Sequence, residues 1–254
     1  EAVRSRVKDQ AFLIKTSPYS DSSLILKAFA RQYGLISILA KGVRKKTQAS
    51  LLSPLNLYEF SFYAPRESGL ALLAEYSLLE EFDLAGRIEC WTAGECALEL
   101  YSQLIIPAEE SPAWFALLRE YLIYLASLER NAVLIWWRFL LRALQMLGIP
   151  FDPGSCSACH SRENPVTAWE KGSGRLLCSA CLDPLSDPDR YERLSSVAAK
   201  VLSLLPVIGD HARSLVLDRA SVACLNSLFA AYYQAHFHKA LRLRGLEVLE
   251  QFYC

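Results

Sequence analysis

The first 80 residues consist of short apolar runs separated by turn-forming pairs of residues. The clearest run is 56–63, in which apolar and polar residues alternate. Tyr58, Phe60 and Phe62 would share one face of that strand. Five such runs predict a small barrel, and the OB-fold is the common five-stranded one. The expected strands are residues 11–16, 23–30, 35–40, 56–63 and 70–79, the last of which could also be helical by composition.

After residue 82 the apolar positions recur every three to four residues, which predicts helices. Pro112 and Pro150 mark helix ends, and Gly148 fits the position after a helix C-terminus. We therefore expect an α+β protein, with an N-terminal OB-fold β-barrel in residues 1–80 and an all-helical domain in residues 81–254. The expected helices are residues 86–106, 112–128, 131–147, 195–205 and 220–243.

Two CxxC pairs interrupt this helical domain. Cys156 and Cys159 form the first pair, Cys178 and Cys181 form the second, and 18 residues separate the pairs. This is the spacing of a zinc ribbon, in which four thiolates complete a closed tetrahedral site. Because a closed site leaves no position for a reacting water, we expect a structural Zn²⁺ in a ribbon inserted at about residues 151–185.

Two other uses of these cysteines remain open. A pair of disulfides would need an oxidising compartment, and the segment Cys156–His160 also matches a haem-attachment motif. The second pair at ribbon spacing argues against haem. The other cysteines are scattered along the chain, which suits free thiols in a reducing, cytoplasmic environment. They are Cys90, Cys96, Cys224 and Cys254.

The sequence predicts neither a targeting segment nor a membrane span. Residues 1–10 are mostly charged or polar, and the most apolar stretch, 133–149, contains Arg138 and Arg142. Two central arginines suit a buried or interfacial helix better than a membrane helix. They lie four residues apart and so share one helical face, either as ordinary solvated side chains or as a positive stripe for an acidic partner.

The zero net charge of the chain hides a strong asymmetry. Residues 1–50 carry ten Lys or Arg and three Asp or Glu, whereas residues 51–130 carry four and thirteen. A basic segment followed by an acidic one indicates nucleic-acid binding. The alternative is that the two segments pair with each other inside the fold.

The densest basic cluster, residues 41–46, follows a predicted strand and begins a loop. Loops between OB strands commonly line a nucleic-acid groove, where cations meet phosphates and aromatic rings stack on unpaired bases. Tyr33, Tyr58 or Tyr63 could supply such a ring, unless each packs in the core. The alternative for the cluster is an ordinary solvated loop. The expected DNA-binding cations are Lys41, Arg44, Lys45 and Lys46, with Lys15, Lys27 and Arg31 extending the track.

No motif of an enzyme is evident, so we expect a non-catalytic protein. The glycines form neither a phosphate-binding loop nor a dinucleotide fingerprint, and no GxSxG occurs. His211 stands alone, while His236 and His238 would point to different sides of a helix. A zinc-dependent nuclease or transferase would need an open metal position. A further rival is a protein-interaction scaffold without direct DNA contact.

Four segments of the first domain carry a resemblance to known proteins. They are residues 11–14 (AFLI), 19–26 (YSDSSLIL), 52–55 (LSPL) and, as the most specific local match, AKGVR within residues 39–44. The order of the parts also fits, with a barrel, a helical domain and an inserted pair of CxxC motifs. On these grounds the chain resembles the RecO family of bacterial recombination mediator proteins.

The resemblance implies a protein that binds single- and double-stranded DNA through its barrel and anneals complementary strands. Such proteins act with a RecR partner, engage the acidic C-terminal tail of single-stranded DNA-binding protein, and help load RecA recombinase. The family's basic barrel residues map onto Lys41 and Arg44. We assign the acidic tail to Arg138 and Arg142. Some family members lack the four cysteines, which implies that the metal braces the scaffold, and the family acts in the cytoplasm at the nucleoid.

Overall fold

The computed structural model describes residues 5–45, 52–64, 69–84, 86–183 and 187–254, with all their side chains except that of Lys45. Contacts divide the chain into two compact units. The first joins Glu1–Ala85 with Ala97–Ala126, and the second joins Gly86–Cys96 with Ser127–Cys254. The first unit therefore contains helical segments as well as the barrel.

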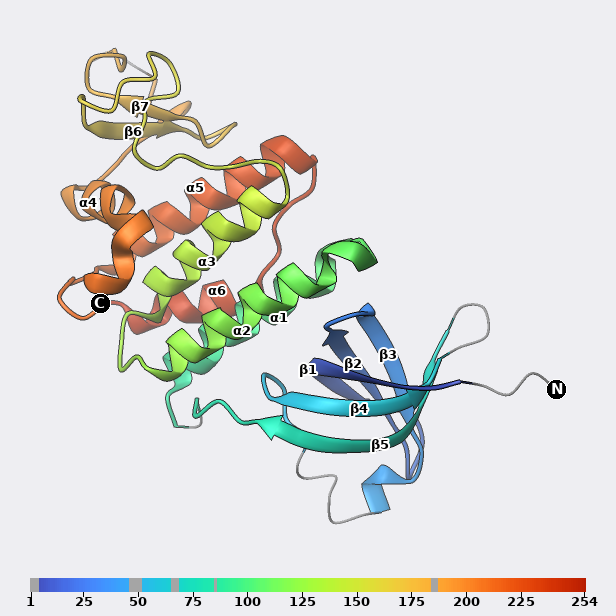
Figure 1. Cartoon of the computed structure of the whole chain (residues 1–254). Helices are drawn as coiled ribbons and strands as arrows, with labels where there is room; N and C mark the ends of the chain where they lie inside the picture. Colours follow the sequence, from blue (N-terminus) through green and yellow to red (C-terminus); the bar gives the residue numbers. More distant parts are fainter. Residues whose placement is uncertain (1–4, 46–51, 65–68, 85, 184–186) are drawn as a thin grey trace. The chain divides into compact units, whose positions relative to one another are not determined.

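Five strands close into a barrel in the order β1-β2-β3-β5-β4 (Figure 1). Neighbouring strands are antiparallel, except that β3 and β5 are parallel. A bulge between Leu13 and Lys15 bends β1, which pairs with both β4 and β2. This confirms the predicted OB-type barrel. The strands are β1 (Arg6–Pro18), β2 (Leu24–Ala30), β3 (Gly34–Ala40), β4 (Leu57–Tyr63) and β5 (Ala71–Glu80).

The interior of the barrel is filled by alternate side chains of each strand. Tyr58, Phe60 and Phe62 of β4 all point inward, as the alternation predicted, and meet Leu13 and Leu26 in one apolar cluster. Tyr58 is 0% exposed, so the idea that it stacks on a base is wrong. Its hydroxyl instead accepts a 2.8 Å hydrogen bond from the amide of Ser53.

Helix α2 (Ser111–Ala126) covers one side of the barrel within the first unit. The ring of Phe115 lies 4.8 Å from that of Phe12 on β1. Gly34, at the start of β3, has φ +65°, and a Cβ there would lie 2.8 Å from Ser111 Oγ. Glycine therefore serves two needs, a left-handed turn and a close approach to α2.

The second unit contains most of the helices. Its described helices, including short 3-10 turns, are α3 (Ala132–Met146), α4 (Ser196–Leu204), α5 (Arg219–Phe237), α6 (Arg244–Leu249), η4 (Leu205–Asp210) and η5 (Glu250–Phe252). Helix α1 (Ile88–Gln103) belongs to the second unit up to Cys96 and to the first unit from Ala97. The short turns η1 (Val43–Lys45) and η3 (Ala108–Glu110) belong to the first unit. The predicted helix 220–243 is wrong at its end, because His238 adopts a left-handed conformation with φ 51° and terminates α5. None of the described helices is long and apolar enough to cross a membrane.

The cysteine-rich insert forms a three-stranded sheet in the order β7-β6-β8. The strands are β6 (Val166–Glu170), β7 (Leu176–Cys178) and β8 (Tyr191–Arg193). Trp169, 2% exposed, and Leu176 are buried. The sheet extends beyond the predicted limit near residue 185, because β8 returns to pair with β6.

Candidate nucleic-acid interface and metal centre

One end of the barrel holds two loops together. Pro18 and Ala40 both pair with Leu24, so the loop after β1 and the loop after β3 begin at the same end. The amide of Arg44 donates to the carbonyl of Ser22 over 3.1 Å. The Arg44 guanidinium Nη1 donates to the carbonyl of Ser20 over 2.8 Å. These bonds fix Arg44 against the loop of residues 19–23.

Two lysines face each other on the outer surface, at the middle of β2 and three residues from this end. Lys15 of β1 is directly paired with Lys27 of β2, and Lys27 lies between the inward-pointing Leu26 and Ala28. Partial burial, and then the like charge of Lys15, lower the pKa of Lys27. Opposed like charges destabilise a strand pair, so a bound anion would stabilise this one.

We call Lys15, Lys27, Lys41 and Arg44 the basic face. Lys15, Lys41 and Arg44 are exposed, and Lys27 is half-buried. Within the described part of the chain, no carboxylate forms an ion pair with any of the four. Their charge is therefore available to an external anion.

Three of the expected DNA-binding cations are not part of the basic face. Lys46 lies outside the described residues, and of Lys45 only the backbone, in η1, is described. Arg31 is exposed but follows Ala30, which pairs with Gly34 at the opposite end of β2 from Leu24. Since β2 has seven residues, Arg31 lies roughly 13 Å from Lys27 and about 23 Å from Leu24 along the strand direction.

The turn that carries Arg31 has its own support. Asp9, 7% exposed, accepts hydrogen bonds from the amides of Gln32 (2.8 Å) and Tyr33 (3.3 Å). Burial raises the pKa of Asp9, although these bonds and the charge of Arg31 oppose the rise. The Tyr33 ring packs edge-on against Phe62 at 5.5 Å. This turn is thus a separate feature from the basic face.

Some basic residues of the first strand do pair with acidic ones, as the alternative reading proposed. Arg6 lies 2.7 Å from Glu75, and Lys8 lies 3.1 Å from Glu59. Both pairs are on the barrel surface. Internal pairing therefore accounts for these two cations and leaves the basic face uncompensated.

Arg138 and Arg142 lie on α3 in the second unit. Arg138 is half-buried and Arg142 is exposed, while most of the apolar residues around them are buried. Both arginines thus lie at the edge of the buried surface of α3. Arg142 also makes an interaction of its own in the structure, so it is not a free cation.

The four predicted metal ligands come together. The sulfur atoms of Cys156, Cys159, Cys178 and Cys181 all lie within 4.8 Å of one another, and all four thiols are free. Cys159 Sγ and Cys178 Sγ are 3.8 Å apart. A tetrahedron with zinc–sulfur bonds of about 2.3 Å has an edge of about 3.8 Å, so these thiols fit a zinc ion.

The protonation of the thiols points the same way. Burial would raise the pKa of Cys156, but amide hydrogen bonds from Cys159, Cys178 and Ala158 lower it to about 6. Hydrogen bonds to Cys159 and Cys178 raise the pKa of Cys181 to about 12. Cys156 is therefore disposed to bind a metal as a thiolate, and a divalent cation would displace the proton of Cys181.

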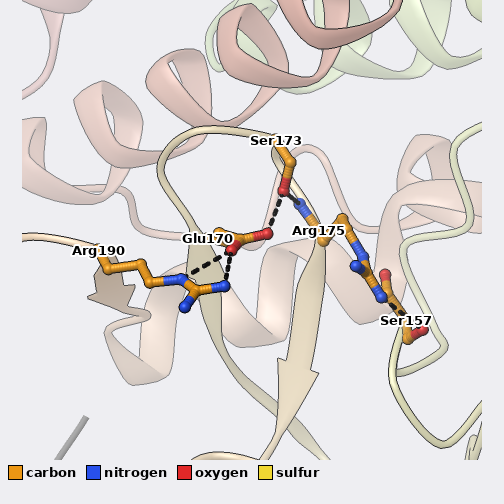
Figure 2. A network of polar contacts seen from close by, with 5 residues as sticks. All are labelled: Ser157, Glu170, Ser173, Arg175 and Arg190. Carbon is orange, nitrogen blue, oxygen red and sulfur yellow. Dashed lines mark hydrogen bonds and ion pairs between the residues drawn. The ribbon is translucent and has the colours of Figure 1, made fainter. Parts of the chain in front are cut away.

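A polar network braces the first cysteine knuckle (Figure 2). Arg190 donates from Nε and Nη2 to Glu170 Oε1 over 2.9 and 2.8 Å. Glu170 Oε2 accepts from Ser173 Oγ at 2.6 Å, and Ser173 Oγ accepts from the amide of Arg175 at 3.3 Å. Arg175 Nη2 then donates to the carbonyl of Ser157 over 3.2 Å, beside Cys156. The network ties β6 and its turn to the ligand loop.

Sequence reasoning missed the role of residues 19–23. Their carbonyls and hydroxyls hold the basic segment, since Ser23 Oγ also accepts from the amide of Gly42 at 3.4 Å. The signal was the cluster of serines next to a predicted turn. It also missed the network of Figure 2, because Glu170 and Arg190 are distant in sequence.

Comparison with known proteins covers almost the whole chain. The family model "Recombination protein O N terminal" matches residues 4–82, and "Recombination protein O C terminal" matches residues 86–245. A protein of Syntrophus aciditrophicus named DNA repair protein RecO is 25% identical over 253 residues, covering 98% of this chain and 96% of the relative. Its namesake in Salinibacter ruber is 28% identical over 254 residues, covering 98% and 95%. That of Bartonella henselae is 30% identical over 184 residues, covering 70% and 68%.

Proposed function

Since this chain belongs to the recombination protein O (RecO) family, we propose that it is a non-catalytic DNA-binding protein of DNA repair. It acts as a recombination mediator in the cytoplasm, at the nucleoid. The name of the relatives, DNA repair protein RecO, supports the repair role. The DNA contact is argued below from the residues of this chain.

The basic face is the observation that carries the proposal. Four cations without described acidic partners lie on the barrel between the middle of β2 and the end at Leu24. Lys and Arg side chains that meet phosphates release counterions, so binding depends on salt and little on sequence. The opposed pair Lys15 and Lys27 is stabilised when a phosphate lies between the two charges. Lys45 and Lys46 are proposed to extend this contact, and Arg31 is proposed to bind a phosphate separately, at the other end of β2.

Annealing follows from the same electrostatics. Two strands repel each other through their phosphates, and a protein that neutralises part of this charge lets complementary segments meet. By the same route the protein would help load RecA recombinase onto strands coated by single-stranded DNA-binding protein, together with a RecR-like partner. The acidic tail of the coating protein would bind at Arg138 and Arg142.

We further propose a structural zinc ion held by Cys156, Cys159, Cys178 and Cys181. Four thiolates close the coordination shell, so the ion supplies folding free energy to a segment with a small core. The ribbon would thereby hold its loops in place. No reacting position is assigned to it.

A strand-annealing assay tests the proposed function. Complementary oligonucleotides are mixed with wild-type protein, with a Lys41→Ala/Arg44→Ala variant, and with Lys8→Ala as the matched control. Lys8 lies on the same barrel but is already paired with Glu59. We expect fast annealing by the wild type and the control, and slow annealing by the double variant. A double variant that anneals at the wild-type rate contradicts the assignment of the basic face.

The partner proposal is tested by repeating the assay on strands coated with single-stranded DNA-binding protein. We expect Arg138→Ala to slow annealing of coated strands and to leave bare strands unaffected, because an acidic tail would lose one cation. Equal rates on coated strands for this variant and the wild type would remove Arg138 from the tail site. Failure of the wild type on bare strands would instead favour a protein-interaction scaffold.

A further inference from the structure

Tyr19 is the aromatic residue that stands out at the basic end of the barrel. Its side chain is 60% exposed, more than that of Tyr33 (45%), Phe252 (40%) or Phe237 (37%). Among the described residues, the Tyr19 ring makes no aromatic contact and its hydroxyl forms no hydrogen bond. A ring with this exposure and no described ring contact has a face on which another flat group can pack.

The position of Tyr19 is fixed by its backbone. Its amide donates to the carbonyl of Ser23 over 3.0 Å, which closes the loop between β1 and β2. The neighbouring carbonyl, of Ser20, accepts from the Arg44 guanidinium over 2.8 Å. The exposed ring is therefore carried on a closed loop whose next residue is bound to a cation of the basic face.

The surface next to this loop suits bases as well as phosphates. Ser17 of β1, Ile25 of β2 and Leu39 of β3 are paired across three strands, and Ile25 and Leu39 are half-exposed on the barrel's outside. This row adjoins the row of Lys15 and Lys27. A single strand could thus place phosphates on the cations and unpaired bases on the apolar row.

We propose that Tyr19 stacks on an unpaired base and sets a preference of the basic face for unpaired over paired DNA. This rests on the proposed function, because it assumes that the basic face binds DNA. A ring can stack only on a base whose face is free, which a duplex does not offer along its length. Phosphate contacts alone do not distinguish these forms, so the discrimination comes from the ring.

The test compares two ligands that carry the same phosphates. One is a single-stranded oligothymidylate, and the other is an oligomer of the same length whose sugars are abasic. Tyr19→Ala should lower affinity for oligothymidylate by about 5- to 150-fold, the effect of losing one base–aromatic stack. It should leave affinity for the abasic oligomer, and the salt dependence, unchanged. Tyr19→Phe should retain wild-type affinity for both.

Controls separate the possible failures. Leu78→Ala removes a half-exposed apolar side chain from β5, at the other end of the barrel, and should change neither affinity. Thermal midpoints of all variants should agree, since Tyr19 has few contacts to lose. Wild-type affinity of Tyr19→Ala for oligothymidylate, or an equal loss on both ligands, would overturn the stacking role alone. A wild-type protein that binds neither ligand would overturn the proposed function itself.

Discussion

Replacing Arg44 with alanine should weaken binding of single-stranded DNA more than replacing Lys41 with alanine. Both changes remove one exposed cation from the same segment. Arg44 has a second role, because its guanidinium donates to the carbonyl of Ser20 and holds the loop that carries Tyr19. No such bond to this loop is described for Lys41. The two substitutions therefore share an electrostatic cost and differ in a structural one.

The magnitudes follow from these contacts. One lost phosphate contact to a single strand lowers the salt slope of log K by about 0.7, which corresponds to roughly a 4-fold loss of affinity at 0.15 M salt. Lys41→Ala should show this loss alone. Arg44→Ala should show it together with part of the Tyr19 contribution of about 1–3 kcal/mol. The two variants should have similar salt slopes and different affinities.

A double-mutant cycle isolates the structural part. Affinities of wild type, Arg44→Ala, Tyr19→Ala and the double variant are measured by fluorescence anisotropy with labelled oligothymidylate. We expect a coupling of at least about 0.5 kcal/mol, because residues joined through one network are not additive. The parallel cycle with Lys41 in place of Arg44 should be additive. Equal losses for Lys41→Ala and Arg44→Ala with additive cycles would refute the argument.

Three further predictions concern stability and the metal. Cys178→Ser should abolish binding of about one equivalent of zinc and lower the thermal midpoint, whereas metal retained at the wild-type level would remove Cys178 from the site. Tyr253→Phe should cost about 1–3 kcal/mol in urea unfolding, since the hydroxyl donates to Glu89 Oε1 at 2.5 Å and accepts from a buried amide of α3. Burial also raises the pKa of Tyr253, so wild-type stability should fall as pH rises above about 10, and the variant should lack that fall. Gly34→Ala should cost about 1–3 kcal/mol through its positive φ and the contact with α2, whereas Gly42→Ala, with φ +69° and open space, should cost less.

The barrel could be predicted because its information is local. Alternation in residues 56–63 places Tyr58, Phe60 and Phe62 on one face, and the structure buries all three. The end of α5 could not be predicted in the same way. His238 takes the left-handed conformation that ends the helix, and this position is usually occupied by glycine, which the sequence lacks there. Strand β8 was missed because three residues carry too little pattern without their partner β6.

The candidate sites differ in how far the sequence determines them. The CxxC spacing alone identified four thiols that the fold brings together, since each pair is local and the sheet joins them. The positions of the expected DNA-binding cations are less fully determined by the sequence. Lys41 and Arg31 are close in sequence, yet successive turns of an antiparallel meander lie at opposite ends. Tyr19 carried no signal of exposure, because a tyrosine near a strand is equally suited to a core.

The most direct measurement of the central claim is the salt dependence of single-stranded DNA binding by the wild-type protein. Four cations on the basic face correspond to a slope of log K against log salt of up to about −2.8. We predict tight binding at low salt and a slope of about −2 to −2.8. Absence of binding at low salt, or an affinity that does not change with salt, would contradict the claim that this face binds DNA.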